Sequence, residues 1–332
     1  MNSIRNIILR NILTISFLVF ALTGCEKDKK TDTLPVIAGT ELFSTGSDGV
    51  TIKAILRNND NESIKNAGAL WSLLPAPSDE NNFVEGNITD SILFVRIEHL
   101  TPGTKYFIRL KIDCREIDIY SDDIAVSTLN RISDTEGNMY NTVLIGSNVW
   151  MKENLRTRKY NDGEQIEYVS EDWSALSTAA YTWYDFDESN GQSYGALYNW
   201  PAVETGKLCP AGWHIAANED WNSVTEYLGG EHLAGGLLKE PFGYWAGPNT
   251  DATDYSGFSA LPGGSSGTRM GSFSGKGFQA FWWESAIDYS YNSEQGMLLF
   301  RAVSYDRPDI ERNGFLSKGG PLNFLSVRCV RD

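Results

Sequence analysis

Two cysteines in the second half of the chain, Cys209 and Cys329, constrain its fold most strongly. If their side chains form a disulfide bond, every element between them is tied to the C-terminal strand. Cys114 lies in a segment with a different sequence pattern, and we expect it to remain unpaired. The alternative is three reduced, buried thiols. Which of the two applies depends on the redox compartment.

The first residues of the chain have the pattern of a signal peptide. Arg5 and Arg10 precede an apolar run at residues 12–22, which is too short to span a bilayer. The run ends in Leu22-Thr23-Gly24-Cys25, which resembles a bacterial lipoprotein box. By that resemblance Cys25 carries lipid and becomes the first mature residue. The alternative is an ordinary signal peptide followed by an incidental cysteine.

The N-terminal pattern predicts an exported protein that is anchored to a membrane. We expect residues 1–24 to be a lipoprotein signal peptide and residues 25–33 to be a polar, flexible tether. The mature protein is then anchored to a membrane through the lipid on Cys25, in the bacterial cell envelope and most simply at the outer membrane. This oxidising location favours the disulfide bond over free thiols.

The charge of the chain excludes one class of partner. The sequence has 43 acidic and 28 basic residues, which gives a formal net charge of −15. Such a surface repels phosphate backbones, so nucleic-acid binding is disfavoured.

Short alternating apolar runs at residues 34–129 predict an all-β sandwich. In one of these runs Tyr106, Ile108, Leu110 and Ile112 share one face of a strand, and Trp71 is expected to be the core aromatic residue. The segment Leu100-Thr101-Pro102-Gly103-Thr104-Lys105-Tyr106, with the closing Val126-Ser127-Thr128, resembles fibronectin type III-like domains that are common in lipoproteins of the Bacteroidetes group. That resemblance implies a spacer or presentation module without chemistry of its own.

The second unit, residues 133–332, differs in composition because it holds nine of the ten tryptophans. Large aromatic side chains bury much area and compensate for scarce regular packing, so we expect an α+β, loop-rich domain. Asn218 is a good N-cap for a helix that ends at Gly229-Gly230, and a second short helix is predicted at residues 232–239.

Several motifs of this unit resemble, in order, those of the Fibrobacter succinogenes major paralogous domain. The motifs are Trp150-Met151-x-Glu153-Asn154-Leu155, Gly195-x-x-Tyr198-Asn199-Trp200, Cys209-Pro210-x-Gly212-Trp213-His214, Gly257-Phe258-Ser259-Ala260-Leu261-Pro262-Gly263-Gly264 and Ser326-Val327-Arg328-Cys329-Val330-Arg331-Asp332. The resemblance implies a variant of the C-type lectin-like fold, in which one disulfide ties the region near the first helix to the last strand.

Metal ligands are sparse in the sequence. His99, His214 and His232 are dispersed, which argues against a zinc site. The best calcium candidates are Asn249, Asp251 and Asp254, although the sugar-binding calcium motifs of lectin-like domains are absent. A solvated acidic loop is the alternative, and we expect no cofactor.

A ligand platform is the remaining candidate site. Trp282, Trp283, Glu284 and Tyr289 concentrate aromatic rings beside glycine-rich loops, and aromatic faces stack well on sugars. The alternative is that one tryptophan belongs to the core and the other covers it. No pair of carboxylates is singled out for glycoside hydrolysis, since acidic residues are abundant and their spacing fixes no geometry.

These observations predict a cell-envelope lipoprotein that displays a lectin-like binding or adhesion domain toward a glycan or surface polymer. The first alternative is a structural or assembly component of a surface appendage, which contacts another surface protein. The second is an enzyme that acts on polysaccharide, although no residue set amounts to a catalytic site and we expect none.

Overall fold

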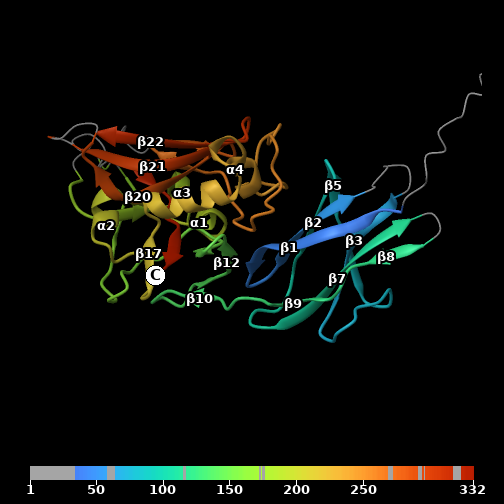
Figure 1. Ribbon diagram of the computed structural model, residues 1–332. Helices are drawn as coiled ribbons and strands as arrows, with labels where there is room; N and C mark the ends of the chain where they lie inside the picture. Colours follow the sequence, from blue (N-terminus) through green and yellow to red (C-terminus); the bar gives the residue numbers. More distant parts are fainter. Residues whose placement is uncertain are drawn as a thin grey trace, which may run out of the picture. The chain divides into compact units, whose positions relative to one another are not determined.

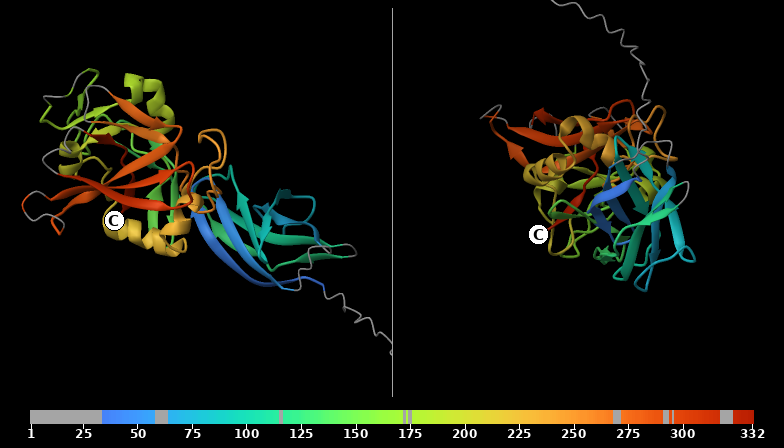
Figure 2. Two further views of the ribbon diagram at one scale, coloured as in Figure 1. Left: turned by 90° about the horizontal axis from the view of Figure 1, so that it is seen from above. Right: turned by 45° about the vertical axis from the view of Figure 1, so that its right-hand side comes forward.

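The computed structural model describes residues 34–57, 64–114, 117–171, 173, 176–267, 272–290, 294, 296–316 and 323–332. The predicted signal peptide (1–24), the tether (25–33) and the lipidation residue Cys25 lie outside the described residues. Residues 34–332 form one unit by their contacts, and Figures 1 and 2 show the sandwich and the C-terminal domain within it. Within the described part of the chain, no helix is both long enough and apolar enough to cross a membrane.

Residues 34–129 form a β sandwich, as predicted. Its strands are β1 (Val36–Gly46), β2 (Val50–Arg57), β3 (Ile64–Ser72), β4 (Asn82–Glu85), β5 (Asn87–Thr89), β6 (Ile92–Ile97), β7 (Lys105–Cys114), β8 (Asp118–Tyr120) and β9 (Ile124–Ser127). One sheet has the order β1-β2-β6-β5, and the other has the order β4-β3-β7-β8, with β9 also paired to β7.

The alternation of apolar residues explains the core of the sandwich. In β7 the side chains of Tyr106, Ile108, Leu110 and Ile112 are all buried, and the residues between them are more exposed. Trp71 is only partly buried and packs at the edge of this core, so its prediction as the core aromatic residue was wrong. The predicted orphan Cys114 is a free, buried thiol.

The C-terminal domain, residues 133–332, consists of short strands and helices joined by long loops. Its first strands are β10 (Ile132–Ser133), β11 (Met139–Tyr140), β12 (Thr142–Ile145), β13 (Asn148–Met151), β14 (Glu167–Tyr168), β15 (Ala180–Thr182), β16 (Leu197–Asn199) and β17 (Trp213–Ile215). The later strands are β18 (Gly263–Ser266), β19 (Phe273–Lys276), β20 (Gln279–Asp288), β21 (Met297–Ser304), β22 (Ile310–Leu316), β23 (Phe324–Leu325) and β24 (Cys329–Arg331). The helices are η1 (Tyr184–Phe186), α1 (Glu188–Tyr194), α2 (Trp200–Glu204), α3 (Asn218–Tyr227) and α4 (Glu231–Leu238).

Helices α3 and α4 match the two predicted helices within a residue or two. Asn218 is the first residue of α3 and not its N-cap; Ala217 occupies that position. The physical reason is that Asn218 Oδ1 accepts a hydrogen bond from Arg301 Nη2 at 3.0 Å, while Asp220 Oδ2 accepts one from the backbone N–H of Ala217. In Figures 1 and 2 both helices (gold) lie beside strands β20 to β22 (red and orange).

A continuous sheet connects the sandwich to the C-terminal domain, with the strand order β17-β24-β13-β12-β1-β2-β6-β5. Strand β1 pairs with β12 antiparallel at Thr45↔Leu144 and Gly46↔Val143 (Figure 1). Side chains reinforce this junction, because the ring of Phe94 stacks on that of Tyr255 with centroids 4.4 Å apart.

The predicted disulfide bond between Cys209 and Cys329 is present, and it joins residues 120 positions apart. It ties the loop before β17 to the last strand, which pairs with β17 and β13. Both cysteines are buried within the largest core of the C-terminal domain. The cross-link therefore holds together a domain in which few elements are long.

Replacing Cys209 with serine is expected to destabilise the protein by about 2–5 kcal/mol, the usual cost of removing a native disulfide. Thermal unfolding of the wild type and of Cys209→Ser, with and without a reducing agent, measures the effect. Reduction should lower the melting temperature of the wild type and of the control Cys114→Ser, but leave Cys209→Ser unchanged. A wild-type melting temperature that does not respond to verified reduction would contradict this expectation.

Candidate functional site

The predicted tryptophan platform is wrong because Trp282 and Trp283 are both completely buried. Neighbouring residues of a strand point to opposite faces, and β20 has a hydrophobic core on each face. Trp282 Nε1 donates to Asn154 Oδ1 at 2.7 Å, and Trp283 Nε1 donates to the carbonyl of Tyr198 at 2.8 Å. Both side chains are core residues. The alternative expectation was that only one of them belongs to the core and that the other covers it.

Glu284 is also buried, and it neutralises two arginines. Its Oε1 accepts from Arg301 Nε at 2.9 Å and from Arg312 Nε at 3.0 Å, and its Oε2 accepts from Arg312 Nη2 at 3.0 Å. Removing one member of such a buried group would leave an uncompensated charge, so the network is structural. Of the four predicted platform residues, only Tyr289 is exposed, so the four do not form one exposed surface.

The predicted calcium candidates do not form a cluster of free oxygen ligands. Asp254 is buried, accepts hydrogen bonds from the backbone N–H and hydroxyl of Ser259, and forms an ion pair with Arg96 at 2.8 Å. Asn249 uses its amide to donate to the carbonyls of Glu240 and Pro241. Within the described residues, no group of three acidic, histidine or cysteine side chains could hold a metal ion.

An exposed group of aromatic side chains lies elsewhere, on two adjoining loops. We call Phe242, Tyr244 and Phe278 the aromatic ledge; their exposed fractions are 78%, 43% and 49%. The two loops are joined by a hydrogen bond of 2.7 Å from the N–H of Ala246 to the carbonyl of Gly277. Exposed rings on two joined loops make this surface a candidate site for a ligand.

Side-chain contacts of Lys239, Trp245 and Asn249 hold the loop of the aromatic ledge in place. Trp245 Nε1 donates to the carbonyl of Ala260 at 3.0 Å, and the ammonium of Lys239 lies 5.6 Å from the centroid of the Trp245 ring. Lys239 is completely buried, and burial lowers its pKa to about 8. The loop is closed by Asn249, so the exposed rings project from a supported backbone.

Sequence reasoning missed the aromatic ledge. The stretch that carries Phe242 lacks the calcium motifs of lectin-like domains. The available signal was the concentration of aromatic and glycine residues in 242–247, which no helical or strand periodicity assigns to a core.

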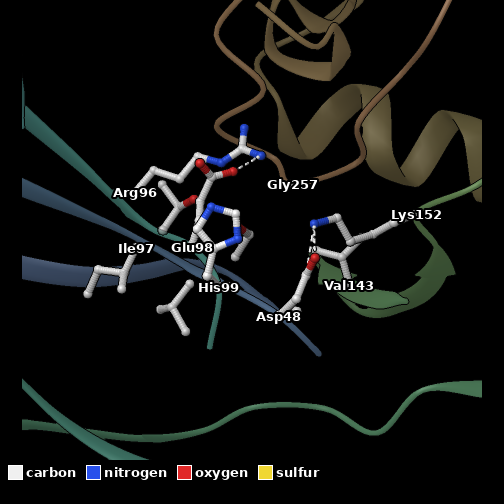
Figure 3. Close-up of a pocket in the computed structure, with 13 residues that line it drawn as sticks. Asp48, Arg96, Ile97, Glu98, His99, Val143, Lys152 and Gly257 are labelled. Carbon is white, nitrogen blue, oxygen red and sulfur yellow. Dashed lines mark hydrogen bonds and ion pairs between the residues drawn. The ribbon is translucent and has the colours of Figure 1, made fainter. Parts of the chain in front are cut away.

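A small polar pocket lies at the junction between the sandwich and the C-terminal domain (Figure 3). Two ion pairs line it: Arg96 with Glu98, and Lys152 with Asp48, each with a closest distance of 2.8 Å. In Figure 3 the imidazole of His99 lies between these pairs. The volume of about 60 Å³ suffices for a few water molecules, so this pocket is part of the junction and not a sugar site.

Beside this pocket a buried guanidinium joins three of the motifs. Arg328 Nε and Nη2 donate to Asn154 Oδ1 at 3.1 and 2.9 Å, and Nη1 donates to the carbonyl of Phe258 at 2.8 Å. The guanidinium also lies over the Phe258 ring, 4.1 Å from its centroid. Burial lowers the pKa of Arg328 to about 9, because the charged form loses its hydration.

Comparison with known families assigns the domain that contains these motifs. The family described as the Fibrobacter succinogenes major domain matches residues 143–331. The chain belongs to this family. This confirms the assignment made from the motifs for the C-terminal domain, and no curated protein matches the chain.

In this Fibrobacter succinogenes major domain, a histidine clamps the C-terminus to helix α3. His214 Nδ1 lies 2.7 Å from Asp332 Oδ1, and His214 Nε2 lies 3.0 Å from Asp220 Oδ2. Burial lowers the pKa of His214, but the hydrogen bonds and charges of the two carboxylates outweigh burial and raise it above the usual 6.5. The protonated imidazole can donate to both carboxylates at once.

The clamp predicts that stability depends on pH. Because the folded-state pKa of His214 is raised, its stabilising contribution is complete below about pH 6.5 and is lost as the pH rises through the folded-state value. The melting-temperature difference between wild type and His214→Gln should therefore shrink between pH 5.5 and pH 9. The control variant is His232→Gln, since His232 is exposed and lies outside the clamp. A difference that grows with pH would contradict the clamp.

Proposed function

We propose that this protein is a lipoprotein of the bacterial cell envelope, at the outer membrane, whose Fibrobacter succinogenes major domain binds a glycan or surface polymer. The pattern Leu22-Thr23-Gly24-Cys25 after an apolar run supports lipidation of Cys25. The sandwich acts as a fibronectin type III-like module that holds the binding domain away from the anchor; its two sheets of antiparallel strands support this assignment.

The C-terminal domain is proposed to be a variant of the C-type lectin-like fold. Its support is the disulfide between Cys209, shortly before helix α3, and Cys329 in the last strand, together with the loop-rich segments between them. Fold analogy alone does not assign a ligand. The ligand surface is therefore argued from the exposed residues.

The observation that carries the proposal is the aromatic ledge. Phe242, Tyr244 and Phe278 are exposed on adjoining loops, which hydrogen bonds of Ala246 and Trp245 hold in place. Rings held in this way lose little conformational entropy on binding, and their faces fit the apolar faces of sugar rings. The proposed binding involves no metal ion. This agrees with the contacts of the Asp254 carboxylate, which forms an ion pair with Arg96 and accepts a hydrogen bond from Ser259.

A specific observation on the sandwich supports the alternative of protein assembly. Leu73 and Phe83, which are 61% and 40% exposed, line a groove of about 610 Å³ together with Trp71. A groove in which exposed apolar side chains lie beside polar ones such as Asn82 and Glu98 fits a protein partner. The alternative function is therefore a structural or assembly component of a surface appendage that contacts another protein through the sandwich.

Alanine at each position of the aromatic ledge is expected to weaken glycan binding about two- to tenfold, since an aromatic contact contributes about 0.5–1.5 kcal/mol beyond area burial. The measurement is binding of the wild type and of Phe242→Ala, Tyr244→Ala and Phe278→Ala to a glycan array and to immobilised polysaccharides. Tyr289→Ala is the matched control, because Tyr289 is an exposed aromatic residue outside the ledge.

The outcomes separate the proposals. Equal binding by all four variants would exclude the ledge as the glycan surface. Absence of any glycan binding, with a stable envelope complex that Phe83→Ser disrupts, would favour the assembly role. Release of oligosaccharide during incubation would instead indicate an enzyme.

Cys25→Ser is expected to remove the membrane anchor, since stable attachment depends on the lipid at this residue. Fractionation of cells should move the protein from the membrane pellet to the soluble fraction, and metabolic labelling with a fatty acid should be lost. Retention of label in Cys25→Ser would contradict lipidation at this cysteine.

A further inference from the structure

A second cavity adjoins the pocket of Figure 3, with which it shares Asp48 and Lys152. Its volume is about 170 Å³, and Arg328 contributes to its wall. None of the aromatic-ledge residues lines it. The cavity is large enough for more than a few water molecules, and residues from both the sandwich and the C-terminal domain form it.

Within the described residues, the buried cation at this cavity has no direct ion pair. Arg328 is 1% exposed, and among the described residues no carboxylate lies within ion-pair distance of it. Its direct contacts are Asn154 Oδ1, the carbonyls of Met151, Lys152 and Phe258, and the ring of Phe258. The charges of Glu153 and Asp254 raise the pKa of Arg328 only from beyond ion-pair distance, and burial outweighs them. A buried charge without an opposite charge is costly.

The acidic side chains of the cavity are already engaged. Asp48 accepts two hydrogen bonds from Lys152 Nζ, at 2.8 and 3.0 Å. Glu153 accepts from the backbone N–H and the side-chain amide of Asn141, each at 2.8 Å. Neither of these two carboxylates therefore bonds directly to Arg328.

Arg328 also has hydrogen-bonding capacity left. Its Nη2 carries two hydrogens. Within the described part of the chain, Nη2 donates to one acceptor, Asn154 Oδ1. Lys152 is a second donor, since an ammonium has three hydrogens and can turn from Asp48 toward a ligand.

We propose that this cavity binds a carboxylate, whose oxygens accept hydrogen bonds from Arg328 Nη2 and Lys152 Nζ. A carboxylate is planar and singly charged, and it matches the planar guanidinium. A dianion such as phosphate or sulfate is disfavoured by the net charge of −15 and by the nearby Asp48 and Glu153. The carboxylate comes either from a uronic acid or from a small free acid.

Thermal unfolding of the full-length protein in detergent tests the site, because a ligand that binds the folded state raises the melting temperature with its concentration. The probes are galacturonate, acetate, galactose and sulfate, at constant ionic strength set with sodium chloride. We expect a concentration-dependent rise with galacturonate or acetate but not with galactose or sulfate. A rise with galacturonate alone identifies a uronic acid, and an equal rise with acetate identifies a small acid.

Two variants change the charge of the cavity in opposite directions. Asp48→Asn should tighten carboxylate binding about threefold, because Lys152 loses its competing partner, and Lys152→Gln should weaken binding by about the same factor. The matched control is Lys207→Gln, since Lys207 pairs with Asp162 at 2.8 Å and does not line the cavity. Dissociation constants come from the concentration dependence of the melting temperature.

Arg328 itself is best observed without replacement, since its contacts with three carbonyls make loss of folding a risk. The ¹⁵N resonances of its side chain should shift on addition of the carboxylate. The proposal is overturned if neither carboxylate raises the melting temperature, if galactose or sulfate acts equally well, or if Asp48→Asn and Lys152→Gln both leave the affinity unchanged. Glycan binding at the aromatic ledge is measured separately, so either proposal can fail alone.

Discussion

The buried guanidinium of Arg328 is the interaction on which the C-terminal domain most depends. It brings together the segment after β13, the loop that carries Phe258 and the last strand, and Asn154 Oδ1 also accepts from Trp282. These residues are far apart in the sequence, yet they form one hydrogen-bonded group. A buried cation held by backbone carbonyls fixes the positions of those carbonyls, because each one lost leaves the charge less compensated. The disulfide one residue further along, at Cys329, holds the same strand covalently.

The parts of the fold that could be predicted from the sequence are those in which a local pattern indicates which residues are buried. The period of two in β7 shows directly which face is buried, and the buried Tyr106, Ile108, Leu110 and Ile112 agree with it. The adjacent residues Trp282 and Trp283 do not show which face of their strand is buried. Adjacent tryptophans are compatible with a strand that has one covered face, and also with β20, which has a core on both faces. Only the tertiary position of β20 decides between the two, so local sequence could not exclude an exposed platform.

The aromatic ledge could not be predicted from the sequence for a related reason. Phe242 and Phe278 are separated in sequence and come together because Ala246 bonds to Gly277 across two loops. A loop contact of this kind has no periodicity and leaves no pattern in a single sequence. The side-chain oxygens of Asn249, Asp251 and Asp254 were calcium candidates on composition alone, whereas Asp254 is the buried partner of Arg96. The residue types show that these side chains are polar, but they do not show which polar group each side chain contacts.

The junction between the sandwich and the C-terminal domain also has a physical purpose. The family match begins at Val143, within β12, and the outer edge of β12 pairs with β1, which lies outside the match. An unpaired edge strand is a site for unwanted association, and β1 covers it at the point where the two units meet. Phe94 from the sandwich then packs on Tyr255, and Arg96 neutralises the buried Asp254. The sandwich therefore completes the sheet and the charge balance of its neighbour, and the cavity beside Arg328 exists only where the two are joined, since Asp48 forms part of its wall.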